Sequence, residues 1–523
     1  MFKKSACYLS ICLLAAPLVA FAEVAPAENQ SPLQLALTQL AVACPGLAKH
    51  VDTPTQALLQ AFYQQQHGQQ VWSVGGRVAA LQAELQHLAD DGLDPANYRL
   101  PTGNVAGDAL CTDIQISQQY LQALQDLHYG RLQQARFEPL WQANEVPRDR
   151  GAEVLAIAGP GLQNIAGAFA QARPSLEQYQ HLRHVYAQQR QKPLPNWQSL
   201  ASGPLLRPDM QDARVPQLAQ RLLNEGYLSS LPVTVDSHYS ATLVSAVKNF
   251  QLSHSLQADG VIGPGTLSEL NVSPAARREQ LRINLERFRW LAQNMEPTSL
   301  LVNVAAAQLI VYQNGLPVWQ TRTQVGRAER QTPLLKSRVT RLTLNPTWTV
   351  PPTILREDKL PEIRRDHTFL SRQNLQVLDS DGQPLAPEDI DWENPGNILL
   401  RQGAGPRNPL GQMAIRFPNP FSVYLHDTPS QALFNKGPRA FSSGCVRVEH
   451  ALQLRDLLLS PAERARTDQL LSTGLTHEFR LATPVPILLT YWTAQADSQG
   501  KVSYAPDIYG HDVALMAALA VKR

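Results

Sequence analysis

The spacing of apolar residues changes near residue 300, from a helical repeat to an alternating one. Upstream, Leu81, Leu85 and Leu88 recur three or four positions apart, as residues do on one face of a helix. Downstream, short alternating or apolar runs predict strands, and Asn314-Gly315 is a typical hairpin turn between two of them. The pattern therefore predicts a multidomain α+β protein. The clearest strand runs are 301–304, 308–312 and 318–321.

The helical repeat predicts a scaffold domain over residues 33–200. Its clearest helices are expected at 118–134 and 174–190, and the Pro-rich stretch 192–208 has the composition of a linker. A further helix, 275–294, carries one apolar stripe. We expect it to pack back on the scaffold, so that the segment between them is an insertion.

Residues 209–272 predict a compact unit of three short helices. The second helix is expected to end near Gln251, and the turn after it contains Gly260 and Gly263, which permit tight backbone turns. Thr266 is expected to cap the third helix.

The mostly-β domain is expected over residues 298–490, with 491–523 as a carboxy-terminal segment. A charged stretch at about 353–395 interrupts the strand rhythm and predicts an inserted subdomain. A lid over a site and a peripheral excursion both fit this stretch.

The amino terminus predicts export. Two lysines, an apolar run at 7–19 and a small-x-small motif at 20–22 are typical of a cleaved signal peptide, residues 1–22. A membrane anchor is disfavoured because the run is shorter than the ~20 residues that a span needs. A lipid anchor at Cys12 is disfavoured because the residue before it is bulky. We expect a mature protein outside the cytoplasm, without a transmembrane segment.

Charge gives no support for a nucleic-acid partner. The chain has 46 Lys and Arg against 44 Asp and Glu, and the signal peptide removes two lysines. The mature chain is therefore close to neutral, whereas nucleic-acid binding usually requires a basic face.

Three cysteines of the chain's five remain after residues 1–22 are removed. An odd number in an oxidising compartment indicates one disulfide and one free thiol. Cys44 and Cys111 lie in the same amino-terminal region and are the natural pair, which leaves Cys445 free. A buried, inert Cys445 is the alternative, and the residues around it disfavour that alternative.

The strand expected at 421–426 presents a base. Its alternation sends the apolar residues to the core and sends Tyr424 and His426 together to the opposite face. His426 is therefore the best candidate for a general base near the free thiol.

The loop that holds Cys445 has the features of an acyl-transfer site. Residues 449–459 predict a helix, so Cys445 would lie just ahead of a helix amino terminus, with Arg447 close by. Both would lower the pKa of the thiol. Gly444 permits the close backbone approach that an oxyanion hole requires.

His426 followed by Ser442-Ser443-Gly444-Cys445-Val446-Arg447 resembles the motif of the YkuD-type L,D-transpeptidases. Phe250-Gln251, with the glycines and threonine that follow, makes residues 209–272 similar to the three-helix peptidoglycan-binding domain of bacterial wall enzymes. The order of parts resembles the large multidomain murein L,D-transpeptidases of Gram-negative bacteria. The resemblance implies a periplasmic enzyme that acts on peptidoglycan tetrapeptide stems and uses no metal or other cofactor.

The resemblance also implies a mechanism. Cys445 would attack the carbonyl of the L-centre of meso-diaminopimelate, backbone N–H groups of Ser443 and Gly444 would hold the oxyanion, and His426 would protonate the departing D-alanine. The amine of a second diaminopimelate would then resolve the thioester and cross-link two stems. By the same resemblance, carbapenems would acylate the thiol. The residues expected to bind substrate are Tyr424, Ser442 and Arg447.

One departure from the family pattern narrows the choice of base. Many members have a histidine where Ser443 stands, so His426 has no rival close to the cysteine. His450 is expected at the surface. A backbone carbonyl is expected to orient His426, because the side chain of Asp427 should point to the other strand face.

Other activities share the same donor half-reaction. An L,D-carboxypeptidase would use water as the acceptor, and an enzyme that attaches a lipoprotein to the wall would use a protein lysine. A wall-binding structural protein is the non-enzymatic alternative, which the intact set of Cys445, His426 and Arg447 disfavours. A cysteine protease is a weaker alternative. The sequence indicates neither the acceptor nor the oligomeric state.

Overall fold

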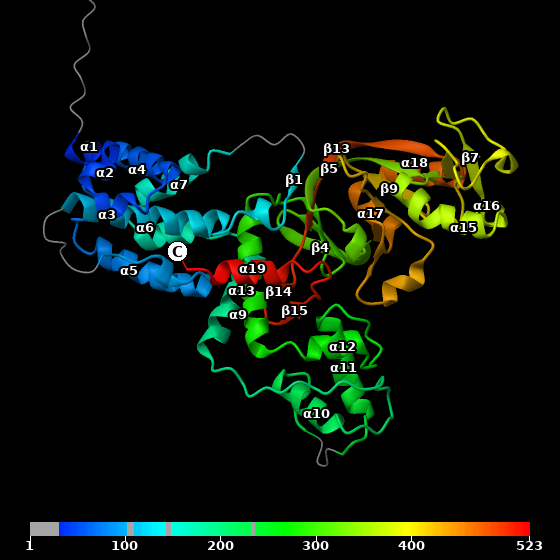
Figure 1. Cartoon of the computed structure of the whole chain (residues 1–523), viewed down its shortest axis with the longest axis horizontal. Helices are drawn as coiled ribbons and strands as arrows, with labels where there is room; N and C mark the ends of the chain where they lie inside the picture. The colour runs from blue at the N-terminus through cyan, green and yellow to red at the C-terminus, as the bar shows by residue number, and fades with distance from the viewer. Residues whose placement is uncertain (1–30, 102–108, 143–147, 232–235, 523) are drawn as a thin grey trace, which may run out of the picture. The chain divides into compact units, whose positions relative to one another are not determined.

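The chain divides into two compact units, Met1–Gln70 and Val71–Arg523. The expected signal peptide lies outside the residues that the structure describes. The computed structural model (Figure 1) describes residues 31–101, 109–142, 148–231 and 236–522.

Short capped helices form the described part of the first unit. Ser31 and Gln34 make a reciprocal capping box at the start of α1. Leu37, Phe62 and Tyr63 are fully buried between the helices. The helices are α1 (Pro32–Thr38), α2 (Leu40–Ala43), α3 (Pro45–Ala48) and α4 (Thr53–Gln65).

The helical amino-terminal region that the sequence predicts is confirmed and continues into the second unit. One of its buried acidic residues is Asp91, which has no exposed surface and accepts hydrogen bonds from Arg173, Tyr179 and Arg183. These donors make the burial of a carboxylate tolerable. The helices are α5 (Arg77–His87), α6 (Ala109–Tyr129), α7 (Arg150–Gly161), α8 (Ile165–Ala172) and α9 (Glu177–Gln191).

Helix α13 (Pro274–Ala292) packs against α9 and against the sheet of the second unit. Its apolar residues share one core with Leu182 of α9 and Leu301 of the sheet. Its fully buried Arg287 is paired with Glu138 and Asp512, each at 2.7 Å. The helix therefore fixes the scaffold helices to the β-rich part.

Helices α10 (Val215–Asn224), α11 (Ala241–Ser253) and α12 (Pro264–Leu270) form the predicted three-helix unit. The expectation that Thr266 caps α12 is wrong. Gly263 occupies the N-cap position because Pro264 fits the first helical position, so the helix begins earlier. Thr266 lies buried inside the helix, where its Oγ1 accepts a hydrogen bond from Gln251 at 3.1 Å.

A ten-stranded sheet carries the β-rich part, and it closes on itself because β9 pairs with both β10 and β5. The predicted hairpin turn is confirmed: Asn314 and Gly315 have φ of 52° and 81°. Strand order is β1-β5-β13-β2-β3-β4-β12-β10-β9, with β11 on β4. Their bounds are β1 Trp141–Gln142, β2 Ser299–Asn303, β3 Gln308–Gln313, β4 Leu316–Gly326, β5 Leu335–Leu344, β9 Met413–Arg416, β10 Leu425–His426, β11 Ala440–Ser442, β12 Val446–Val448 and β13 His477–Thr490.

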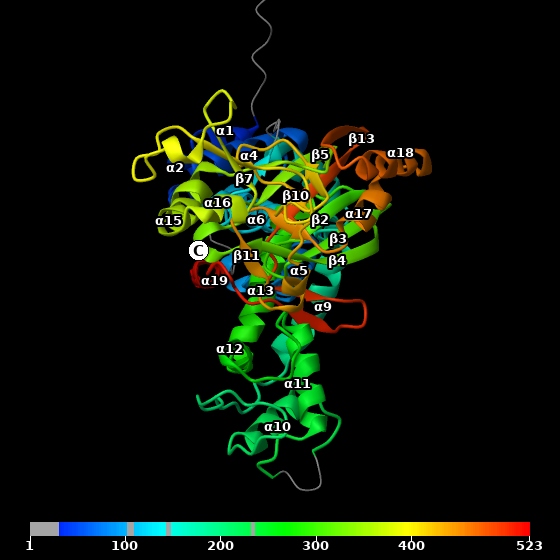
Figure 2. The same ribbon diagram turned by 90° about the vertical axis from the view of Figure 1, so that its right-hand side faces the viewer.

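The insertion between β5 and β9 is a subdomain with its own core. Ile363, Val377 and Leu400 are buried together, away from the core of the large sheet. Helices α15 and α16 lie beside β7 in both views (Figures 1 and 2). Its elements are β6 (Trp348–Thr349), α14 (Pro352–Ile354), a π-helical turn (Leu355–Lys359), α15 (Leu360–Arg365), α16 (Thr368–Arg372), β7 (Leu375–Leu378) and β8 (Leu399–Gln402).

The remaining elements follow the loop that contains Cys445. Tyr491 and Tyr509 of the carboxy-terminal segment stack at 5.5 Å and lie close to the site described below. Within the described residues, no helix has the length and apolarity that crossing a bilayer demands. The elements are α17 (Ala451–Leu458), α18 (Pro461–Ser472), β14 (Ala494–Ala496), β15 (Val502–Tyr504) and α19 (Asp512–Ala520).

Candidate active site

Two neighbouring parallel strands bring the predicted site residues together. In the pairing of β10 with β12, Leu425 lies opposite Val446, and His426 opposite Arg447. Leu425 and Val446 are fully buried in the core of the large sheet. Because side chains alternate along a strand, the other face carries the site residues. On the strands these are His426 and Arg447; Tyr424 and Cys445 directly precede β10 and β12.

The predicted strand over 421–426 is too long. Only Leu425 and His426 are in the strand, because Ser422 has a φ of 56° and breaks the extended backbone. Phe421, which was expected in the core, is 47% exposed and contacts the ring of Trp141. The facing of Tyr424 and His426 nevertheless holds, since their rings are 5.7 Å apart.

The environment of Cys445 differs from the prediction. Cys445 is the free, partly exposed cysteine of the described residues, and its Sγ lies 3.8 Å from the Ser422 carbonyl oxygen. Strand β12, not a helix, follows it, so no helix dipole acts on the thiol. Burial raises the pKa of Cys445, although Tyr424 and two arginines, Arg416 and Arg447, act in the opposite direction.

His426 is buried and neutral. Burial, with the charges of Arg447 and Arg416, lowers its pKa to about 3. Its Nδ1 lies 2.5 Å from the Asp427 carbonyl oxygen, so a backbone carbonyl orients the ring. A neutral imidazole that donates from Nδ1 has its lone pair on Nε2. The Asp427 carboxylate instead accepts a hydrogen bond from the Gln412 N–H at 2.9 Å.

The two pKa shifts determine the protonation of Cys445 and His426 in the free protein. A thiol with a raised pKa and an imidazole with a pKa of about 3 are both uncharged near neutral pH. The pair therefore consists of a neutral thiol and a neutral imidazole near neutral pH.

The loop before Cys445 is fixed by its own hydroxyl groups. Gly444 has a φ of 116° and donates its N–H to the Ser442 Oγ at 3.1 Å. Ser442 is 2% exposed and its hydroxyl donates to the Cys445 carbonyl. Ser442 therefore holds the loop, and the Gly444 N–H already has a protein acceptor; the predicted roles of both residues in binding substrate and oxyanion stay predictions.

The orientation of the Gly444–Cys445 peptide is set by Thr332. Its Oγ1 donates to the Gly444 carbonyl oxygen at 2.8 Å. In a trans peptide the C=O and the following N–H point in opposite directions, so this bond turns the Cys445 N–H away from Thr332. Within the described chain, the N–H groups of Ser443 and Cys445 donate to no protein acceptor.

Thr332 is itself held from two sides. Its Oγ1 accepts the Gly326 N–H at 2.8 Å, and its own N–H donates to the Tyr509 hydroxyl at 3.0 Å. The same hydroxyl donates to the Gly326 carbonyl oxygen at 2.8 Å. Sequence reasoning missed Thr332, because no local pattern links it to a loop far along the chain.

Two arginines frame the thiol. Arg447 donates to the Gln324 Oε1 at 3.1 Å, and its buried Nε has no protein partner. Arg416, also missed from the sequence, lies over the Tyr424 ring at 3.8 Å. Burial raises the pKa of Tyr424, which keeps its hydroxyl protonated and able to donate. The arrangement provides positive charge and donors on the substrate side.

The exposed Ser443 connects the loop to the inserted subdomain. Its Oγ accepts a hydrogen bond from Arg330 at 3.0 Å. Arg330 also pairs with Glu357 at 2.6 Å and Asp358 at 2.7 Å, both in the π-helical turn. Whether the subdomain moves as a lid stays a prediction. The described residues contain no cluster of side chains suited to a metal ion.

The remaining sequence-based assignments concern cysteine and histidine residues outside the site. Cys44 and Cys111 are both disulfide-bonded. The His450 side chain is 58% exposed and lies just before α17, where it contacts Glu449.

Three parts of the chain match known protein families. Residues 297–487 match YkuD, the L,D-transpeptidase catalytic domain. Residues 57–185 match a Scaffold domain, and residues 211–270 match a family described as "Putative peptidoglycan binding domain". A curated relative from Haemophilus influenzae, named "Putative L,D-transpeptidase", is 33% identical over 282 residues, which are 51% of this chain and 57% of the relative.

Solved structures with weak similarity carry related names. The L,D-transpeptidase from Mycobacterium smegmatis is 15% identical, covering 37% of this chain and 58% of its own, with a TM-score of 0.19. The L,D-transpeptidase from Xylanimonas cellulosilytica is 16% identical, covering 56% of this chain and 99% of its own, with a TM-score of 0.17.

The fold and the family matches define a multidomain protein that contains an L,D-transpeptidase catalytic domain and a putative peptidoglycan-binding domain. The match of residues 297–487 to the L,D-transpeptidase catalytic domain, together with the match of residues 211–270, confirms the family resemblance of these two domains. The chain spans little more than half the length of the curated relative that it matches.

Proposed function

We propose that this protein is a periplasmic L,D-transpeptidase that cross-links two meso-diaminopimelate residues of peptidoglycan through a thioester on Cys445. The observation that carries the proposal is the pairing of β10 with β12, which sets His426 opposite Arg447 just after Cys445, in a domain that matches the L,D-transpeptidase catalytic domain. Export through residues 1–22 belongs to the same proposal, because peptidoglycan lies outside the cytoplasm.

In the first half-reaction, His426 Nε2 accepts the Cys445 thiol proton as sulfur attacks the carbonyl of the L-centre of diaminopimelate. The oxyanion accepts hydrogen bonds from the N–H groups of Cys445 and Ser443, which have no acceptor in the described chain. The C–N bond then breaks, His426 returns the proton to the departing D-alanine amine, and a thioester remains.

In the second half-reaction, the side-chain amine of another diaminopimelate attacks the thioester. His426 accepts a proton from this amine and returns it to the thiolate as the C–S bond breaks. The products are a new amide between two stems and the original thiol. Substrate carboxylates would be attracted by Arg447 and Arg416, since the buried Arg447 Nε has no protein partner.

The test is incubation of the purified mature protein with disaccharide-tetrapeptide, followed by mass spectrometry. We expect a dimer that has lost one D-alanine, and a covalent adduct of Cys445 when a carbapenem is added. Cys445→Ala should abolish both, and His426→Gln should slow both. Replacing exposed His450 by Gln is the matched control and should leave both unchanged.

The product distribution distinguishes the alternatives. Tripeptide alone would identify an L,D-carboxypeptidase. Transfer to a lysine-containing peptide would indicate attachment of a protein to the wall. No product and no adduct from the unmutated protein would refute the enzymatic proposal and leave a wall-binding role.

A further inference from the structure

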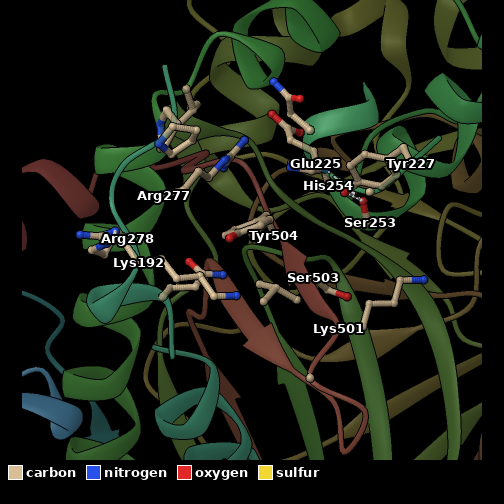
Figure 3. A pocket seen from close by; sticks show the side chains of 18 of the residues that line it. Lys192, Glu225, Tyr227, Ser253, His254, Arg277, Arg278, Lys501, Ser503 and Tyr504 are labelled. Carbon is tan, nitrogen blue, oxygen red and sulfur yellow. Dashed lines mark hydrogen bonds between the residues drawn. The ribbon is translucent and has the colours of Figure 1, made fainter. Parts of the chain in front are cut away.

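A second pocket, remote in sequence from the cysteine loop, lies where the three-helix unit meets α13 and the β14–β15 hairpin. Its volume is about 960 Å³. This is within the range of about 300–1,000 Å³ that is typical of sites for small molecules and short peptides. It is lined from five segments: the linker after α9, the end of α10, the end of α11, the start of α13, and the hairpin (Figure 3).

The lining is strongly cationic. Lys192, Arg278 and Lys501 face the pocket, and none of them forms an ion pair within the described chain. Arg278 donates one hydrogen bond to the Lys192 carbonyl. Lys192 and Arg278 lie on one side of the view in Figure 3 and Lys501 on the other. A ligand between them would meet positive charge from both sides.

The other charged lining residues do not cancel this excess. Arg277 is already paired with Glu269, at 2.6 Å. Glu225, the acidic residue of the lining, lies 3.8 Å from Arg221. Because the whole chain carries a formal charge of only +2, three unpaired cations around one pocket are a local feature.

The wall between these cations is rigid. The Tyr504 ring lies under Arg277, at 4.5 Å, and stacks on His254 at 5.1 Å. The Ser255 hydroxyl donates to the Tyr504 carbonyl at 3.0 Å, which fastens the hairpin to the three-helix unit. A pocket whose walls are fixed before binding loses little conformational entropy when a ligand enters.

We propose that this pocket binds the carboxylate-bearing peptide stem of peptidoglycan, and that the binding site of the three-helix unit is completed by α13 and the β14–β15 hairpin. The stem carries several carboxylates, and lysine and arginine are their natural partners. The choice of ligand rests on the proposed function. A peptidoglycan stem bound in this pocket is therefore held by the same compact unit that contains the ten-stranded sheet.

Binding is tested in the Cys445→Ala protein, so that catalysis does not contribute. Sedimentation with intact sacculi is compared with sacculi whose stems an amidase has removed. A triple variant, Lys192→Glu, Arg278→Glu and Lys501→Glu, is set against a control triple of exposed cations outside the pocket. The control substitutions are Lys248→Glu, Arg466→Glu and Arg480→Glu.

We expect the Cys445→Ala protein and the control triple to bind intact sacculi about tenfold more tightly than stripped sacculi. The pocket triple should lose this preference. Equal binding to both kinds of sacculi by the Cys445→Ala protein, or a full preference in the pocket triple, would overturn the proposal. Stronger retention by vesicles of anionic phospholipid than by intact sacculi would also overturn it, since phosphate would then be the ligand.

A second measurement uses the unmutated protein and does not depend on the variants folding. Soluble tetrapeptide should protect Lys192 and Lys501, but not Lys248, from acetylation by an activated ester, as read by mass spectrometry. No protection, or equal protection of Lys248, would count against the pocket. Release of D-alanine from soluble substrate is assayed separately, so its absence refutes the proposed activity while protection still decides the binding site.

Discussion

Thr332→Val removes the hydroxyl that orients the proposed oxyanion hole while keeping the size of the side chain. The change breaks two buried hydrogen bonds, from the Gly326 N–H and to the Gly444 carbonyl, each 2.8 Å long. Leaving a buried polar group unpaired costs about 1–3 kcal/mol. The Gly444–Cys445 peptide then loses the bond that turns the Cys445 N–H toward the substrate side.

The loss of catalytic rate in this variant should not exceed the loss caused by removing one oxyanion-hole donor completely. Complete loss of such a donor slows acyl transfer by about 10²–10³-fold. Because the valine variant only frees the peptide to rotate, we expect acylation of Cys445 by a carbapenem to slow by about 10–100-fold. Thr332→Ser keeps the hydroxyl and should retain most of the rate.

The assay separates this role from general damage. Adduct formation by a carbapenem passes through an oxyanion, whereas alkylation of Cys445 by iodoacetamide does not. In Thr332→Val, acylation should fall while alkylation stays close to the unmutated rate. Unchanged acylation, or a parallel fall in both rates, would refute the assigned role of Thr332.

Three further results are expected. Burial raises the pKa of the Cys445 thiol, so the rate of its alkylation should still increase with pH at about pH 9. A rate that reaches its plateau near neutral pH would instead indicate an ion pair between a Cys445 thiolate and a protonated His426. Burial lowers the pKa of His254 to about 3, while the unfolded imidazole takes up a proton below about pH 6.5, so stability falls on acidification through this window. Between pH 6.5 and 5, the free energy of unfolding measured in urea should fall by about 2 kcal/mol less in His254→Gln than in the unmutated protein. An equal fall in both proteins would contradict the buried, neutral state assigned to His254. Gln251→Leu removes the hydrogen bonds that the Gln251 side chain makes to Gly260 and Thr266, and it should weaken the hydrogen-exchange protection of α11 by about 2–3 kcal/mol. Ser245→Ala, on the exposed face of the same helix, should leave this protection unchanged. Equal protection in the two variants would show that the Gln251 hydrogen bonds contribute little.

The prediction of the site succeeded where it rested on alternation. Alternation predicts that Tyr424 and His426 face the same way, and their rings lie 5.7 Å apart. Alternation failed at Ser422, whose positive φ ends the extended backbone. Nothing in a single strand's pattern shows where the chain leaves the sheet.

The electrostatic prediction failed for a different reason. The sequence indicated a helix soon after Cys445, and α17 does begin at Ala451. The intervening residues, however, join the large sheet as β12, so the helix dipole cannot act on the thiol. Burial then becomes the dominant effect on the Cys445 pKa, and burial is a property of the packed domain.

The sequence by itself determined the fold class and the resemblance to a family. Helical and alternating repeats set the α+β class, and the string around Cys445, with His426, specified the family. These features are local, since each depends on residue types at fixed spacing along the chain.

Tertiary structure decided which groups support that chemistry. Thr332, Arg416 and Tyr509 reach the cysteine loop from segments that are distant along the chain. The cations of the separate pocket beside Tyr504 are also brought together from distant segments. Their roles depend on which strands pair and which way one peptide turns. Strand pairing and burial are long-range outcomes of packing, and no local pattern of residues encodes them.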